Sequence, residues 1–150
     1  MEHHFCRVRH DPANGQFGDC LRACIASVLS IQDPLTVPHF FHDGCDGDVG
    51  HSRMKEWLRA NHGLIPFYVG IDGDYKLTET LQFMGGDASV TDAVYMLMGS
   101  IGDEWGDHIV VCRGAEIVHD PAWFKMQLQG PCKANGLWVA VLLIKDVPQS

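Results

Sequence analysis

GDCLRACIASVL, residues 18–29, carries the clearest structural signal in the sequence. Its apolar residues recur at the spacing of one α-helical face, and they are Leu21, Cys24, Ile25, Val28 and Leu29. Asp19 lies just before this face, where an N-cap residue is favoured. We therefore expect a helix from Cys20 to about Ser30, and this helix begins at a cysteine.

Outward from this helix, the pattern changes from helical to extended. A second helix is expected from Ser52 to about Asn61, ended by Gly63, and the stretch from Phe40 to Gly50 before it is typical of a loop. The second half is rich in β-branched and apolar residues separated by Gly, Asp and Pro. This predicts short strands at 64–69, 93–98, 108–112, 116–119 and 137–144, while 78–83 is ambiguous. Helices followed by strands predict one α+β domain over residues 1–150, with a mostly antiparallel sheet.

The composition is that of an ordinary globular protein, with 46% hydrophobic and 20% charged residues. The formal net charge of −8 disfavours binding to nucleic acid or to an anionic membrane, because phosphate groups repel an acidic chain. The chain starts without the basic and apolar segments of a signal peptide, and its longest apolar run, 137–144, is too short to span a bilayer. We expect a soluble, cytoplasmic protein with six reduced cysteines, whose oligomeric state stays open.

Cys20 has the position of a nucleophile. The first turn of a helix offers unpaired N–H groups and a partial positive charge, and both favour a thiolate over a thiol. Cys20 also lies at the edge of the apolar face, where a side chain can reach a cleft, whereas Cys24 points to the core. Gly15 and Gly18 allow the preceding backbone to turn sharply and to pass close to a substrate. The alternative is that Cys20 is a small core residue.

A thiolate nucleophile needs a general base and a group that orients the base. His108 opens the expected strand 108–112, and Asp120 follows the expected strand 116–119. A three-residue turn at 113–115 would place His108 opposite Asp120, within reach of a hydrogen bond, and we favour it because it pairs Val110 with Val118. A two-residue turn at 113–114 would place His108 opposite His119. Taken singly, both residues are ordinary structural features, so the hypothesis depends on their combination with the cysteine.

NGQFGDC, residues 14–20, is similar to the papain-type pattern of an amide residue, Gly, two residues, Gly, one residue and the nucleophile. Together with AC at 23–24, HIVV at 108–111 and DP at 120–121, it resembles the bacteriocin-leader (double-glycine) peptidases of ABC transporters. The resemblance covers about residues 12–30 and 105–122 and leaves 31–104 unmatched. It implies a papain-like fold, in which a helix that carries the thiol packs on an antiparallel sheet that carries the histidine and the aspartate. It also implies a cysteine peptidase.

The resemblance further implies an oxyanion donor, which in this family is usually a glutamine six residues before the nucleophile. Asn14 holds that position here, while Gln16 has the right side chain but lies four residues before the nucleophile. We expect Asn14 to act with the backbone N–H of Cys20, and Gln16 is the alternative. The first hypothesis is therefore a hydrolase of peptide, amide or isopeptide bonds that acts through Cys20, His108 and Asp120. It would need a peptide or protein substrate and no cofactor, and acyl transfer or deamidation would use the same parts.

Two other hypotheses stay open. The same fold without turnover would be a binding module for a peptide or protein partner. A metal-dependent enzyme could be built from His108, His119 and a loop rich in possible ligands. The spacing in that loop matches neither a zinc finger nor an EF-hand, so we favour a solvated loop at the rim of the cleft and expect no metal. Its possible ligands are His39, His42, Asp43, Cys45, Asp46, Asp48 and His51.

Two smaller expectations concern the surroundings of the site. Trp105, three residues before His108, is a candidate for shielding the histidine and aspartate from water. The start of the chain, with His3, His4 and His10, is expected to be loose.

Overall fold

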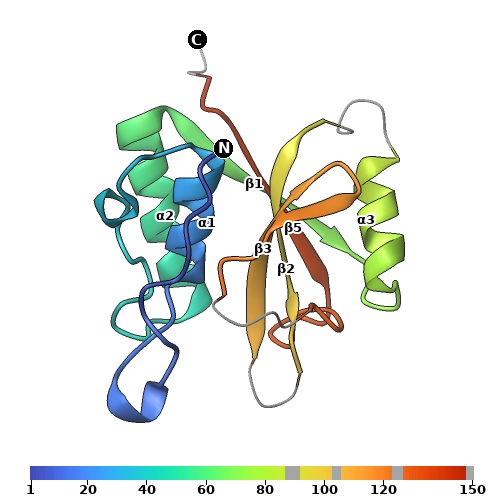
Figure 1. The fold of residues 1–150 in the computed structure, drawn as a ribbon, viewed down its shortest axis with the longest axis horizontal. Coiled ribbons are helices and arrows are strands. Elements are labelled where there is room, and N and C mark those ends of the chain that lie inside the picture. The colour runs from blue at the N-terminus through green and yellow to red at the C-terminus, as the bar shows by residue number, and fades with distance from the viewer. Residues whose placement is uncertain (87–91, 103–105, 123–126, 148–150) are drawn as a thin grey trace.

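A computed structural model of the chain describes residues 1–86, 92–102, 106–122 and 127–147. Two α-helices come first, α1 (Cys20–Val28) and α2 (Gly47–His62), with two short 3-10 helices at Pro12–Asn14 and Pro34–Thr36. A strand and a third helix follow, and the rest of the described chain is extended (Figure 1). These later elements are β1 (Leu64–Ile71), α3 (Leu77–Gly85), β2 (Val94–Ser100), β3 (Asp107–Arg113), β4 (Glu116–His119) and β5 (Trp138–Lys145).

The five strands that the structure describes form one sheet in the order β1-β5-β2-β3-β4. Every neighbouring pair is antiparallel, and β5, the last strand of the chain, lies between β1 and β2. Helices combined with an antiparallel sheet confirm the α+β class expected from the sequence. The strands expected at 116–119 and 108–112 agree with β4 and β3 to within one residue.

Helices cover both faces of this sheet, as Figure 1 shows, with α1 and α2 on one side and α3 on the other. α1 packs against β3 and α2 against β1, and their apolar side chains share a core with Met96 and Val111. On the opposite face, Met84 of α3 packs with Leu97 and Trp138. The helix that begins at Cys20 is therefore held against the strand that contains His108.

Two helices are longer than the sequence predicted. α2 begins at Gly47 rather than Ser52, because Asp46 caps it by accepting a hydrogen bond from the N–H of Val49 (3.0 Å). The expected loop therefore ends at residue 46, while Gly63 ends α2 as predicted, with φ 61°. The ambiguous stretch 78–83 lies within the full helix α3. None of the helices in the described ranges has both the length and the apolar character that crossing a membrane requires.

The first residues of the chain are bound to α1 rather than loose, which corrects the expectation for this segment. We call residues 3–8 the strap. The N–H of His4 donates to the hydroxyl of Ser27 (3.0 Å), and the N–H of Cys6 donates to the carbonyl of Pro121 (2.8 Å). The strap thus joins α1 to the turn that follows β4, and Figure 1 shows it running along α1.

Asp19 occupies the N-cap position of α1, but its side chain binds the strap. Its carboxylate is 2% exposed and accepts hydrogen bonds from the N–H groups of Arg7 and Val8, both at 2.9 Å. It also lies 3.2 Å from Nε of Arg22 in an ion pair. Asp19 holds the predicted N-cap position, and its carbonyl accepts from the N–H of Ala23 (3.1 Å), but its side chain makes no capping hydrogen bond to the first turn of α1. The carboxylate instead binds the backbone of the strap.

Candidate active site

Cys20 is the first residue of α1, as the sequence predicted, and its side chain is partly exposed. Its Sγ atom lies 2.6 Å from Sγ of Cys6, which the strap holds beside it. Cys24, one turn further along α1, is fully buried, and its thiol donates to the carbonyl of Ile109 at 3.6 Å. The helix is therefore anchored to β3 through Cys24 while Cys20 stays at the edge of the core.

His108 and Asp120 lie together beside this thiol. Nε2 of His108 donates a hydrogen bond to Oδ1 of Asp120 at 2.7 Å, and the imidazole is 5% exposed. The same carboxylate oxygen accepts from the N–H of Ala122 at 3.0 Å, which fixes its direction. Because Nε2 is engaged by Asp120, Nδ1 is the ring nitrogen left for the thiol of Cys20.

The strand pairing that brings His108 and Asp120 together differs from the predicted one. The turn consists of residues 114 and 115, so that Arg113 faces Glu116, and the expected three-residue turn is wrong. Gly114, with φ 59°, supplies the left-handed conformation that such a short turn requires.

A β-bulge at Val118 shifts the register between β3 and β4. Cys112 pairs with Ile117 but Val111 pairs with His119, which leaves Val118 as an extra residue in β4. The bulge shifts the register by one residue. Asp120 follows directly after β4, and its carboxylate meets the ring of His108 there.

The surroundings of Cys20 favour its ionised form. A hydrogen bond from Cys6, followed by a hydrogen bond and the positive charge of His108, lowers the pKa of the Cys20 thiol to about 6, although burial opposes this shift. Burial also disfavours the charged form of His108, but hydrogen bonds to Asp120 and Cys20 and their negative charges raise the pKa of the ring to about 9. Between these two values, the pair consists of a thiolate and an imidazolium.

The surroundings of the other five cysteines raise the pKa of their thiols. The hydrogen bond to Cys20 and burial raise the pKa of Cys6, so Cys6 remains the thiol that donates to the Cys20 thiolate. Burial raises the pKa of Cys24 and Cys45, and it raises those of Cys112 and Cys132 to about 12. All six cysteines are free, and Cys20 alone among them has a lowered pKa.

Among the described residues, neither candidate oxyanion amide, Asn14 or Gln16, makes a hydrogen bond to Cys20. Asn14 is exposed at the end of the 3-10 helix, and its Nδ2 donates to Oδ2 of Asp11 at 2.7 Å. Gln16 is exposed as well, and its backbone pairs with that of Asp11. The two amides therefore lie in a tight turn closed by Asp11, ahead of Cys20.

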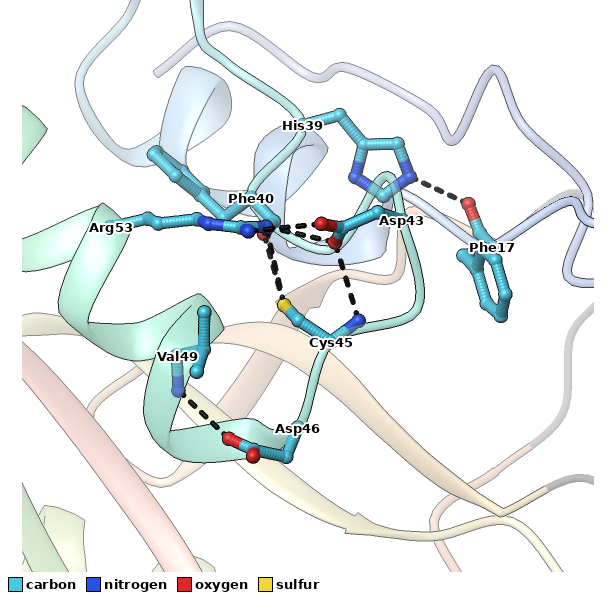
Figure 2. Close-up of polar contacts among 8 residues, drawn as sticks. All are labelled: Phe17, His39, Phe40, Asp43, Cys45, Asp46, Val49 and Arg53. Atoms are coloured by element: carbon cyan, nitrogen blue, oxygen red, sulfur yellow. Dashed lines mark hydrogen bonds and ion pairs between the residues drawn. The ribbon is translucent and has the colours of Figure 1, made fainter.

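The loop at 39–46 uses its side chains for its own structure, as Figure 2 shows. Arg53 of α2 binds both carboxylate oxygens of Asp43 (2.9 and 3.0 Å), and it also donates to the carbonyl of Phe40 (2.9 Å). His39 contacts the carbonyl of Phe17 at 2.6 Å, and a Cβ on Gly44 would collide with the Phe17 ring. The loop is thus folded by Arg53 and packed on the segment that leads to Cys20.

The metal hypothesis finds no support in the part of the chain that the structure describes, where no group of three or more His, Cys, Asp or Glu residues could hold a metal ion. His119 is occupied elsewhere, because its ring packs against those of His3 and Phe5 and its Nε2 contacts the carbonyl of His4 at 2.5 Å. Trp105 lies outside the described residues.

Cys6 is the neighbour of the thiol that sequence reasoning missed. It lies in a segment without helical or strand periodicity, and its contact with Cys20 spans 14 residues of sequence. Its only sequence signal was an isolated cysteine among histidines near the start of the chain, which is typical of a frayed terminus.

Comparisons of the chain with models of protein families, with curated proteins and with solved structures found no match.

Proposed function

We propose that this chain is a papain-like cysteine hydrolase that cleaves peptide or other amide bonds, isopeptide bonds included. Cys20 is the nucleophile, His108 is the general acid and base, and Asp120 orients the imidazole. The observation that carries the proposal is the position of His108. Its ring is hydrogen-bonded to Asp120 at 2.7 Å. The hydrogen bond and the positive charge of the same ring lower the pKa of Cys20.

The proposed reaction begins from the thiolate and imidazolium pair. The Cys20 thiolate attacks the carbonyl carbon of the substrate, and His108 gives its proton to the leaving amine. His108, now neutral, takes a proton from water, which hydrolyses the thioester and releases the acid. An acceptor amine in place of water would give acyl transfer, and a side-chain amide as substrate would give deamidation.

The negative oxygen formed in each step needs hydrogen-bond donors. The N–H of Cys20 at the start of α1 is one proposed donor, because helix N-termini favour negative charge. The second is the amide of Asn14 or Gln16. Asn14 would have to exchange its bond with Asp11 for one with the substrate.

The chemistry requires no cofactor, and its substrate is a peptide or protein. Six free thiols suit a reducing compartment, so the cytoplasm is the proposed location.

A second candidate is a binding module on the same papain-like frame. Two observations favour it: the Asn14 amide is bonded to Asp11, and the Sγ atom of Cys6 occupies one side of the Cys20 thiol. Such a module would bind a peptide or protein partner without turnover.

A Cys20→Ser variant separates the two candidates. The hydrolase predicts that the wild-type chain cleaves members of a fluorogenic peptide library and that Cys20→Ser loses all measurable cleavage, because a serine hydroxyl is not ionised by this site. Cys45→Ser, which changes a cysteine of the 39–46 loop, is the matched control and is expected to keep full activity. Cleavage that persists in Cys20→Ser would overturn the assignment. Binding of library peptides by the wild type without any cleavage would favour the module.

A further inference from the structure

Two thiols of opposite ionisation tendency lie side by side at the start of α1. Sγ of Cys6 is 2.6 Å from Sγ of Cys20, and Cys6 is only 5% exposed. The hydrolase chemistry gives Cys6 no role in bond cleavage. We propose that Cys20 is a site of reversible oxidation by hydroperoxides and that Cys6 is its resolving thiol, so that the two form a disulfide.

The backbone holds Cys6 in this position from both sides. Its own N–H donates to the carbonyl of Pro121 (2.8 Å), and the next two N–H groups, of Arg7 and Val8, donate to the buried carboxylate of Asp19 (both 2.9 Å). Asp19 is the residue immediately before Cys20. The strap is therefore attached to the same turn that carries Cys20, and this attachment holds the two sulfur atoms 2.6 Å apart.

The proposed chemistry has two balanced steps. The Cys20 thiolate attacks the terminal oxygen of a hydroperoxide, which forms the sulfenic acid and releases an alkoxide or hydroxide that takes up a proton. The Cys6 thiol then attacks the sulfenic sulfur, which forms the S–S bond and releases water. A dithiol reductant returns both residues to thiols and is itself oxidised to a disulfide.

Cys24 is unsuited to the resolving role although it lies closer in sequence. Its side chain is fully buried and donates to the carbonyl of Ile109. Cys45 lies in the loop that Arg53 folds, and its thiol donates to the carbonyl of Phe40 at 3.5 Å. Cys6 is thus the thiol that the geometry selects.

The disulfide would have a protective consequence. A sulfenic acid without a resolving thiol is oxidised further to sulfinic acid, which dithiol reductants do not reverse. With Cys6 in place, peroxide would switch the nucleophile off and a reductant would restore it. This inference needs only the two thiols and no substrate, so it can hold even if the chain hydrolyses nothing.

The test uses the reduced, full-length chain and hydrogen peroxide at neutral pH. After treatment, free thiols are blocked with iodoacetamide and the chain is digested with trypsin, which cuts after Arg7, Arg9 and Arg22. We expect a disulfide-linked pair of peptides, 1–7 with 10–22, that disappears when dithiothreitol precedes the blocking step. Peroxide that converts wild-type Cys20 to sulfinic acid, with no linked pair at any dose, would overturn the proposal.

A Cys6→Ser variant gives the complementary result. Serine keeps a hydrogen-bond donor beside Cys20 but cannot form the disulfide, so we expect Cys20 to pass to sulfinic acid and to stay unreactive after dithiothreitol. Cys45→Ser is the control and is expected to behave as the wild type does. Recovery of Cys20 in Cys6→Ser to the wild-type extent would contradict the resolving role. If Cys6→Ser fails to fold, the linked peptides of the wild type decide the question alone.

Discussion

Replacing His108 with alanine is expected to slow the alkylation of Cys20 by iodoacetamide at pH about 6, because the imidazolium that stabilises the thiolate is gone. With a pKa of about 6, half of the Cys20 thiols are ionised at this pH. A cysteine with a pKa near 9 would be ionised roughly 500-fold less, and its thiolate would be roughly 20-fold more nucleophilic. The complete loss of the shift therefore corresponds to labelling that is about 25-fold slower.

His108→Ala alone should approach this limit without reaching it, since the hydrogen bond from Cys6 also lowers the pKa of Cys20. The double variant with Cys6→Ala should reach or exceed it, because burial and the negative charge of Asp19 then raise the pKa of Cys20 unopposed. Asp120→Asn should have a smaller effect than His108→Ala, because the ring remains while its orientation suffers. His42→Ala, which removes an exposed histidine, is the matched control and should not change the rate. A folded His108→Ala variant that is labelled as fast as the wild type would show that the two side chains are not coupled.

Replacing Asp19 with alanine is expected to cause the largest loss of stability of any single change near the site. The substitution leaves the charge of Arg22 without its partner and two backbone N–H groups of the strap without an acceptor. Breaking a buried ion pair on one side costs about 3–5 kcal/mol. We therefore expect the free energy of unfolding in urea to fall by about 3 kcal/mol or more, together with faster labelling of Cys6 as the strap is released.

Asp146→Ala provides the comparison for Asp19→Ala. Asp146 also pairs with an arginine, Arg59, at 2.9 Å, but the Arg59 side chain is exposed and that of Asp146 is partly exposed. Exposed pairs contribute about 0–1 kcal/mol, so this variant should unfold close to the wild-type urea concentration. Equal urea midpoints for Asp19→Ala and Asp146→Ala would contradict the role given to Asp19.

Local patterns predicted the elements that carry the site. The apolar spacing over 21–29 placed the start of α1 at Cys20, and β-branched residues placed β3 and β4 to within one residue. These features depend on neighbours within a few positions, so the sequence contains them directly. The start of α2 was missed because Asp46 was read as part of the loop rather than as a cap.

The contacts between distant segments were not predictable in the same way. Nothing in the spacing of residues 3–8 indicates that they lie along α1, because no periodicity marks a segment whose partners are single side chains such as Ser27 and Asp19. The predicted register between β3 and β4 was wrong for a related reason. A bulge at Val118 changes the register by one residue, and residue type alone does not reveal it.

The contact between His108 and Asp120 was predicted, but the turn that leads to it was not. The residue types and their order suggested an imidazole and a carboxylate in contact, and the structure places them 2.7 Å apart. The turn that was expected to bring them together is not the one the chain uses.

The pH dependence of iodoacetamide labelling decides whether Cys20 is a thiolate that is paired with the imidazolium of His108. The pKa of Cys20 is lowered to about 6 and that of His108 is raised to about 9, so the ion pair exists between these two values. The rate of iodoacetamide labelling of peptide 10–22 should therefore rise through pH about 6, stay level, and rise again near pH about 9, as the imidazolium loses its proton. A single rise near pH 9, the ordinary pKa of a cysteine thiol, would show that Cys20 and His108 do not form an ion pair.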